Sequence, residues 1–324
     1  VAQCGMLTKI LSLLKVLGGF HVARYLTRND LRILCYHGFA VGDEHDFLPE
    51  LFITRADFAG RLELLTRAGF CVLPLDAAIG HLRSGTLPPR SVVITIDDGF
   101  HGTVVHAVPE LERRKLPATV YLTTYHVRHQ DPVFGLTLQY IVWKTRRDQI
   151  DLSSLGLAGV VAPATALGHL SRTDLSALVP AVTQYAATVL TRTERQTLLR
   201  GVAAQCGVDF DAIDASRMFH LLNADEVAAV SRAGLSVEMH THRHRSWGVE
   251  AMALSELREN REEIEAIVGR RPVHFCYPSG RYDRYDRAWL EAAGVESATT
   301  CVPGFVRPGT SRFLLGRFTD SALV

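Results

Sequence analysis

Two adjacent carboxylates and a glycine directly follow a run of β-branched residues. Residues 92–96 have the pattern of a strand that is buried on both faces of a parallel sheet. Asp97, Asp98 and Gly99 come next. Neighbouring side chains on an extended chain point in opposite directions, so one carboxylate could bind a metal while the other accepts a proton. An Asp-Gly turn with no chemical role is the alternative interpretation.

A second group of candidate ligands follows another predicted strand, residues 235–239. His240, His242 and His244 lie within five residues. Imidazole nitrogens suit zinc and similar divalent metals, and a carboxylate would complete a site that keeps open positions. A histidine-rich surface loop is the alternative. Because both motifs end strands of one predicted sheet, we expect them to project from the same edge.

The elements around these motifs alternate between strands and helices. This alternation predicts a parallel sheet covered by helices, either as a barrel or as a doubly wound sheet. The predicted strands are 32–36, 70–75, 92–96, 117–123, 235–239, 273–277, 297–301 and 313–318. A mostly helical insertion at about 131–222 interrupts the rhythm, and insertions of this kind commonly shape substrate selection.

The N-terminal segment, residues 1–30, stands apart from the main domain over 31–324. Residues 6–20 have an apolar helical face, and Gly18-Gly19 is expected to end this helix. The helix either packs on the domain or makes peripheral contact with a membrane surface. It is too short to span a bilayer, and no clear signal-peptide cleavage site follows it. We therefore expect a cytoplasmic protein or one peripheral to the inner membrane.

Composition excludes some classes of function. The 324 residues are 47% hydrophobic, which is enough for one large core, and the net charge of +1 gives no nucleic-acid-binding footprint. The six cysteines are scattered without a CxxC motif. They are expected to be free thiols in a reducing compartment.

Three motifs together resemble the polysaccharide deacetylase family, also called the NodB-homology group or carbohydrate esterase family 4. They are Thr95-Ile-Asp-Asp-Gly99, His240-Thr-His-Arg-His244 and Phe275-Cys-Tyr-Pro-Ser-Gly280. The resemblance runs from about residue 31 to residue 320 and is weakest across the insertion. The Tyr36-His37 pair is similar to the motif of the poly-N-acetylglucosamine deacetylase subgroup.

This resemblance implies a distorted (β/α) barrel of about seven strands. The implied activity is metal-dependent hydrolysis of N-acetyl groups on an N-acetylated glycan or glycoconjugate, which releases acetate and a free amine. By resemblance, Asp98, His240 and His244 bind the divalent metal, for which zinc is expected and cobalt, nickel or manganese are alternatives. Asp97 would be the general base, and no metal role falls to His242.

Two departures from the family pattern shape the remaining predictions. Cys276 stands where the family has an arginine that orients the base, and Ser279 stands where it has a tyrosine whose backbone N–H stabilises the oxyanion. The stretch 314–318 lacks the family's late histidine, so we assign the general acid to His37. Further substrate contacts are expected from four residues: Tyr277, Pro278, Trp247 and Arg243.

Other activities fit the same residues. A hydrolase of this fold could act on O-acetyl esters or on small cyclic amides. The altered third motif also leaves open a non-catalytic glycan-binding module.

Overall fold

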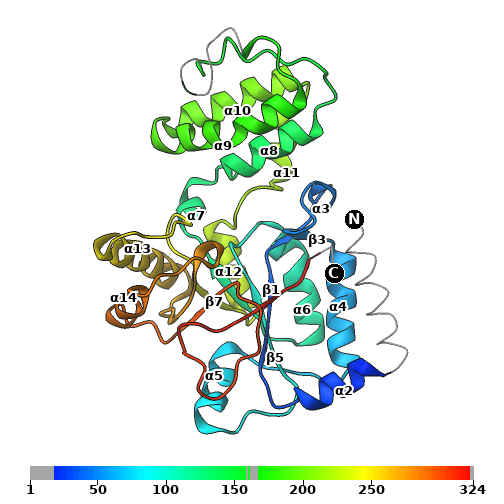
Figure 1. Cartoon of the computed structure of the whole chain (residues 1–324), viewed down its shortest axis with the longest axis vertical. Coiled ribbons are helices and arrows are strands. Elements are labelled where there is room, and N and C mark those ends of the chain that lie inside the picture. The colour runs from blue at the N-terminus through cyan, green and yellow to red at the C-terminus, as the bar shows by residue number, and fades with distance from the viewer. Residues whose placement is uncertain (1–17, 158–159, 161–166, 322–324) are drawn as a thin grey trace.

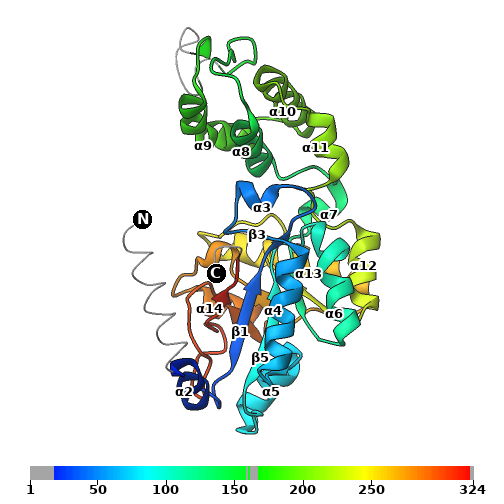
Figure 2. The ribbon, with the colours of Figure 1, turned by 90° about the vertical axis from the view of Figure 1, so that its right-hand side faces the viewer.

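A parallel sheet of seven strands forms the centre of the molecule. The computed structural model describes residues 18–157, 160 and 167–321. The sheet curls into a half-barrel with helices on its outside, in agreement with the predicted (β/α) barrel (Figures 1 and 2). In spatial order its strands are β10 (Phe318–Thr319), β1 (Arg32–Tyr36), β5 (Ser91–Ile96), β6 (Thr119–Leu122), β7 (Ser236–Met239), β8 (His274–Cys276) and β9 (Ser297–Thr299).

Short accessory strands flank this sheet. β4 (Cys71–Val72) pairs with the first residues of β5, and β2 (Gly38–Phe39) pairs with β3 (Phe52–Ile53) in a separate two-stranded sheet. Backbone bonds from Leu315 to β9 and from β10 to β1 connect the last segment to both sides of the curled sheet. The C-terminal segment therefore passes close to the end of β5, where the two aspartates lie.

The helices bury one face each against the sheet. All six residues of β5 are buried, as its β-branched pattern predicts. Phe58 and Leu62 of α4, Leu111 of α6, Val227 of α12 and Leu257 of α13 belong to the same core. These helices are α4 (Arg55–Arg67), α6 (Val108–Arg114), α12 (Ala224–Arg232) and α13 (Glu250–Val268), with α5 (Leu75–Ser84) and α14 (Asp286–Ala292) completing the outer layer.

Polar side chains set the starts of several helices. The Thr54 hydroxyl accepts a hydrogen bond from the Asp57 backbone N–H at the start of α4. Asn223 and Glu226 form a capping box that begins α12, as their spacing predicts. α12 leads directly into β7, so this cap helps to determine where the histidine motif begins.

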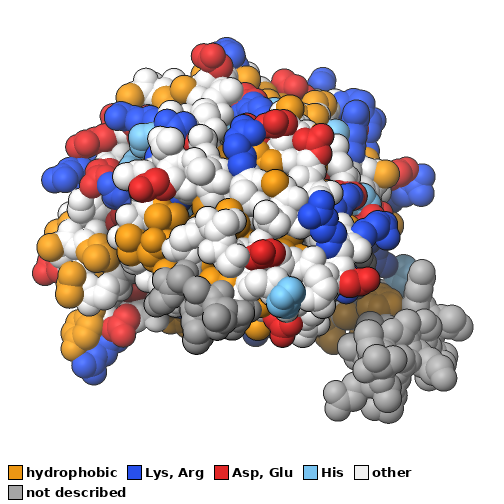
Figure 3. Space-filling model, turned by 90° about the horizontal axis from the view of Figure 1, so that it is seen from above, with side chains coloured by type: hydrophobic (Ala, Val, Ile, Leu, Met, Phe, Trp, Pro, Cys, Tyr) orange, Lys and Arg blue, Asp and Glu red, His pale blue; other side chains and the backbone are white. Residues whose placement is uncertain are grey.

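A helical lobe stands beyond the carboxyl ends of the strands (Figure 1). It contains α8 (Phe134–Lys144), α9 (Arg172–Thr188), α10 (Arg192–Cys206) and α11 (Phe210–Ser216). Phe52 and Phe100 of the barrel pack with the apolar residues of the lobe in one cluster. Seen from above, basic and acidic side chains are interspersed over this end of the molecule (Figure 3). The lobe joins the barrel through the short α7 (Tyr125–His129) and α11.

Several predicted boundaries were wrong. The predicted strand 70–75 is reduced to the two-residue β4, and β10 begins only at Phe318, the last residue of the predicted strand 313–318. Residues 44–47 form the short helix α3 (Glu44–Phe47). The helix α5 begins at Leu75, and the carboxylate of Asp76 in its first turn bonds to His274.

The N-terminal prediction is tested only in part. Gly18 is the N-cap of α2 (Gly19–Leu26), so this glycine pair begins a helix where we predicted an end. Residues 6–17 of the predicted amphipathic helix lie outside the described residues. Among the described helices, none combines the length and the apolar character that crossing a bilayer requires.

Candidate active site

Asp98, His240 and His244 converge at the carboxyl edge of the sheet. The Asp98 Oδ1 atom lies 3.2 Å from His240 Nε2 and 3.2 Å from His244 Nε2. The two imidazole rings contact each other edge to face, with centroids 4.9 Å apart. Asp98 follows β5 and the histidines follow β7, so the parallel sheet brings together residues that are more than a hundred positions apart in the sequence.

These three side chains fit a divalent metal. Their ligand atoms all lie within 4.8 Å of one another. The Asp98 Oδ1 atom is buried and accepts no hydrogen bond from the described part of the chain, so it has free capacity to bind a cation. Burial alone would raise the pKa of Asp98, but the two histidines outweigh it and hold this pKa well below its usual value. The carboxylate is therefore ionised, as a metal ligand must be.

Hydrogen bonds fix the orientation of His240. Its Nδ1 lies 2.8 Å from the Cys276 carbonyl oxygen, which places the proton on Nδ1 and leaves Nε2 free to face Asp98. The Asn260 side chain accepts from the His240 backbone N–H and donates to the Leu122 carbonyl and the Thr124 hydroxyl. Asn260 of α13 thus ties the histidine loop to the end of β6.

His242 faces away from this cluster. Its Nδ1 lies 2.9 Å from the Thr124 hydroxyl, and its Nε2 lies 3.7 Å from a Glu259 oxygen. The structure therefore directs two of the three histidines toward Asp98 and the third toward α13.

Backbone strain gathers at the same place. Asp98, Thr241, His244 and Ser279 all adopt positive φ angles, between 53° and 66°. A non-glycine residue in this region costs on the order of 1–3 kcal/mol and persists only where its surroundings impose it. Four such residues at the ends of β5, β7 and β8 indicate that packing holds this edge in a shape that the local sequence would not choose.

Asp97 points to the other side of β5 and is held by Arg317. The Arg317 guanidinium donates to both carboxylate oxygens, each at 2.7 Å. Both side chains are buried, with 0% and 2% of their surface exposed. Burial would raise the pKa of Asp97, but the Arg317 charge outweighs it and keeps this pKa far below its usual value. Because Arg317 occupies both oxygens, Asp97 is less suited to metal binding than Asp98.

Sequence reasoning missed Arg317. Its remaining donors are also satisfied, because Nε donates to the Thr300 carbonyl at 2.9 Å and one terminal nitrogen donates to the Thr95 hydroxyl at 3.1 Å. A signal was present in the sequence, since Arg317 is the single charged residue in the apolar stretch 313–318. A charged residue in a buried strand requires a partner of opposite charge.

Two thiols complete the surroundings of Asp97. Burial raises the pKa of the Cys276 and Cys35 thiols well above their ordinary value, so both are protonated. The Cys276 Sγ lies 3.3 Å and the Cys35 Sγ 3.6 Å from the Asp97 Oδ2 atom, within reach of weak S–H donation. The five described cysteines are free.

His37 lies beside Asp97 rather than beside Asp98. Its Nε2 is 3.8 Å from the Asp97 Oδ2, and 19% of its side chain is exposed. It follows β1, the strand next to β5, so the parallel pairing of these two strands brings it to the same edge. His37 is thus a partly accessible imidazole within reach of both solvent and the buried carboxylate.

A cavity of ≈ 240 Å³ opens at the predicted ligands. Asp98 and His244 contribute to its wall, and most of the remaining wall is apolar. Phe100 and Leu221 line it from the barrel side, whereas Val133 and Leu136 come from the start of the helical lobe. The insertion therefore shapes the space next to the candidate metal ligands.

Residues 166–298 match the family model "Polysaccharide deacetylase". This part of the chain is similar to a polysaccharide deacetylase domain. The matched residues include both histidines of the cluster and the motif around Ser279, while the two aspartates lie before them. This match agrees with the resemblance that the sequence motifs predicted.

Solved structures share the fold of this chain at low sequence identity. IcaB from Ammonifex degensii is 17% identical with a TM-score of 0.56, covering 90% of this chain and 92% of its own. The deacetylase PplD from Streptococcus pyogenes is 14% identical with a TM-score of 0.57, covering 90% and 93%. A de-N-acetylase from Aggregatibacter actinomycetemcomitans is 13% identical with a TM-score of 0.55, covering 91% and 96%. No curated protein sequence matches the chain.

Ser279 occupies a turn after β8 with φ 54°. Its backbone N–H donates to no group in the described part of the deacetylase domain, while the next N–H, of Gly280, bonds to the Tyr277 carbonyl at 2.9 Å. A free backbone donor at the carboxyl edge is what an oxyanion site requires.

The other predicted substrate contacts have structural roles. Trp247 stacks on Phe275 in the core, and its indole N–H donates to Asp286 at 2.7 Å. Tyr277 and Pro278 are buried as well. Arg243 pairs with Glu256 and Glu259 of α13, each at 2.9 Å. None of these four side chains lines the cavity at Asp98, so their placement favours packing over glycan contact.

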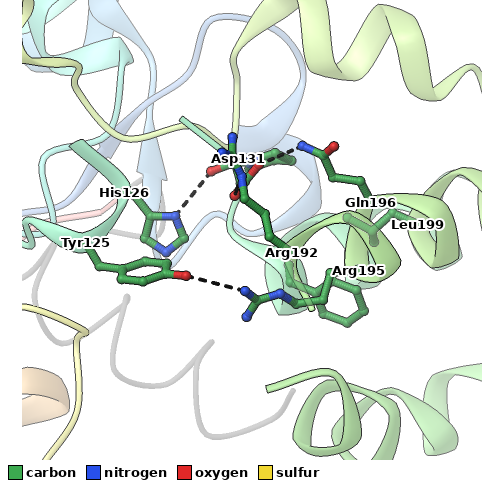
Figure 4. Close-up of a pocket in the computed structure, with 9 residues that line it drawn as sticks. Tyr125, His126, Asp131, Arg192, Arg195, Gln196 and Leu199 are labelled. Carbon is green, nitrogen blue, oxygen red and sulfur yellow. Dashed lines mark hydrogen bonds and ion pairs between the residues drawn. The ribbon is translucent and has the colours of Figure 1, made fainter. Parts of the chain in front are cut away.

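His126 lines both the active-site cavity and a smaller pocket beneath the helical lobe (Figure 4). In this pocket Asp131 binds Arg192 at 2.6 Å and Gln196 at 2.6 Å, both from α10. Burial lowers the pKa of His126 to about 4, so its imidazole is neutral near pH 7. The network fastens α10 to the barrel beside the active site.

Proposed function

We propose that the protein is a metal-dependent N-deacetylase that removes acetyl groups from an N-acetylated amino sugar in a glycan or glycoconjugate. One observation carries the proposal. A carboxylate and two imidazoles, free of other partners on their facing atoms, adjoin a cavity, and a second carboxylate is buried beside them. The family match supports the same conclusion.

Asp98, His240 and His244 would hold the metal, with zinc as our first expectation. A divalent metal there would act as a Lewis acid on water and on the acetyl carbonyl. Asp97 would accept the proton of the attacking water, and the Ser279 N–H would donate to the developing oxyanion. The low pKa of Asp97 keeps it ionised at any pH of interest but makes it a weak base. A cation held by Asp98, His240 and His244 would lower the pKa of the attacking water and so help Asp97 to accept its proton.

Acetate release from N-acetylglucosamine oligomers tests this function. Zinc-loaded protein is expected to release acetate, and Asp97→Asn is expected to lower the rate by at least about a hundredfold, the usual contribution of a general base. The zinc content of the variant should equal that of the unaltered protein, because Asp97 is not a proposed ligand.

Other outcomes would redirect the proposal. Release of acetate from an acetylated xylan but not from the oligomers would indicate an O-acetyl esterase. Stoichiometric zinc and oligomer binding without acetate release would indicate a glycan-binding module. An Asp97→Asn variant with undiminished turnover would exclude Asp97 as the base.

We further propose that His37 protonates the departing amine. His37→Asn is expected to retain zinc while acetate release falls at least about a hundredfold, since the leaving amine then lacks its acid. His45→Asn provides a comparison, because the one ion pair of this histidine in the described part of the chain is with its neighbour Asp46, outside the candidate site. Near-normal turnover in His37→Asn would exclude the assignment.

A further inference from the structure

The helix α2 exposes an apolar face to solvent. It has no buried residue. Val22, Tyr25 and Leu26 lie on one side of the helix and are 58%, 63% and 72% exposed. Phe20, near the start of the helix, is 42% exposed and projects from another side. An amphipathic helix normally buries such a face, so this one lacks a partner among the described residues.

The other side of α2 is basic. His21 and Arg24 of α2, with Arg28 just beyond its last residue, join Tyr25, Arg67 of α4 and Arg90 around an open cavity of ≈ 370 Å³. None of the residues that line this cavity is acidic. Arg67 has one carboxylate partner, Glu63, on its own helix, and the Arg28 guanidinium lies over the Tyr25 ring. Four guanidinium groups thus surround a space that contains no carboxylate.

This surface lies at the end of the barrel opposite the active site. α2 immediately precedes β1, at the amino ends of the strands, whereas Asp98 and His240 follow the carboxyl ends of their strands (Figures 1 and 2). A partner bound to α2 would leave the cavity at Asp98 open.

We propose that this surface, formed by Val22, Tyr25 and Leu26 with Arg24, Arg28, Arg67 and Arg90, docks the protein on a membrane that contains anionic phospholipids. Apolar side chains of an amphipathic helix insert at the boundary between headgroups and acyl chains. Guanidinium groups bind phosphate oxygens in pairs, and basic residues near an anionic leaflet add attraction. The positive charge around the cavity therefore complements phospholipid headgroups. The proposal does not depend on the proposed deacetylation.

Vesicle flotation tests the docking. The full chain is expected to float with vesicles of phosphatidylcholine that contain about one third phosphatidylglycerol. It is expected not to float with vesicles of pure phosphatidylcholine. Binding to the anionic vesicles should weaken when salt rises from about 0.1 M to about 0.5 M, because salt screens the exposed arginines. Failure of the full chain to bind the anionic vesicles would overturn the proposal.

Two variants assign the binding to this surface. Arg24→Gln/Arg28→Gln and Val22→Ser/Leu26→Ser are each expected to lower the partition coefficient at least about tenfold. Arg172→Gln/Arg258→Gln removes the same charge elsewhere, from exposed arginines with no ion-pair partner in the described part of the chain, and should bind normally. Equal binding by all three variants would overturn the assignment. A protein that does not float with the vesicles but forms a dimer through α2 in size-exclusion chromatography would also overturn it.

Discussion

Replacing Arg317 by methionine is expected to lower the free energy of unfolding by about 3–5 kcal/mol, the usual effect of breaking a buried ion pair. The Asp97 carboxylate would remain buried without its counter-charge, beside the Cys276 and Cys35 thiols as weak donors and the His37 imidazole at 3.8 Å. Acetate release should also fall by about a hundredfold, because a small displacement of a catalytic group has an effect of that size. Zinc content should not change, since Arg317 contacts none of the proposed ligands.

The pH dependence of this effect distinguishes an ion pair from simple packing. The folded pKa of Asp97 lies below its unfolded value, so its contribution to stability is present above about pH 4 and is lost as pH falls through the folded pKa. In Arg317→Met the pKa of Asp97 should rise, because burial then acts without the opposing charge. The difference in stability between the two proteins should therefore be largest near neutral pH and shrink toward pH 4. Denaturant unfolding of metal-free protein measures it.

Arg307 offers a matched control. It makes the same two-nitrogen contact with Asp30, at 3.0 and 2.9 Å, but is 61% exposed. Arg307→Met should change the stability little, because exposed ion pairs contribute little. Arg317→Lys keeps the charge but not the forked geometry and should fall between the other two variants. If Arg317→Met were as stable as Arg307→Met at every pH, the role assigned to Arg317 would be wrong.

Removing the His244 imidazole should abolish stoichiometric zinc binding. His244→Ala is expected to lower zinc affinity by at least about a hundredfold. Losing a residue that only supports a metal ligand lowers the affinity by up to about a hundredfold, and a direct ligand contributes more. Its side chain is 41% exposed, so the fold should tolerate the change. Isothermal titration with zinc and metal analysis after dialysis measure the loss.

His242 provides the control within the same loop. It lies two positions from each of the two proposed histidine ligands but contacts Thr124 and Glu259 instead of Asp98. His242→Ala should therefore keep its zinc affinity within a few-fold. Loss of zinc from His242→Ala together with retention in His244→Ala would contradict the proposed ligand set.

Local sequence patterns were sufficient to predict where the reactive side chains lie along the chain. The β-branched run before Asp97 and the strand before His240 are each recognisable within a few residues, because a buried parallel strand requires apolar side chains on both faces. Parallel strands place their carboxyl ends at one edge, so the convergence of Asp98 with His240 and His244 was predictable without coordinates.

Contacts between distant segments decided the rest. Arg317 reaches Asp97 across 220 positions, and only the path of the last segment between β9 and β1 brings it there. Trp247 and Arg243 look like sugar-binding residues in the sequence. In the fold, Trp247 stacks on Phe275 and Arg243 pairs with Glu256 of α13. Periodicity reports whether a side chain faces the interior. Which partner it meets there depends on how the sheet curls and on which segments its edges bring together.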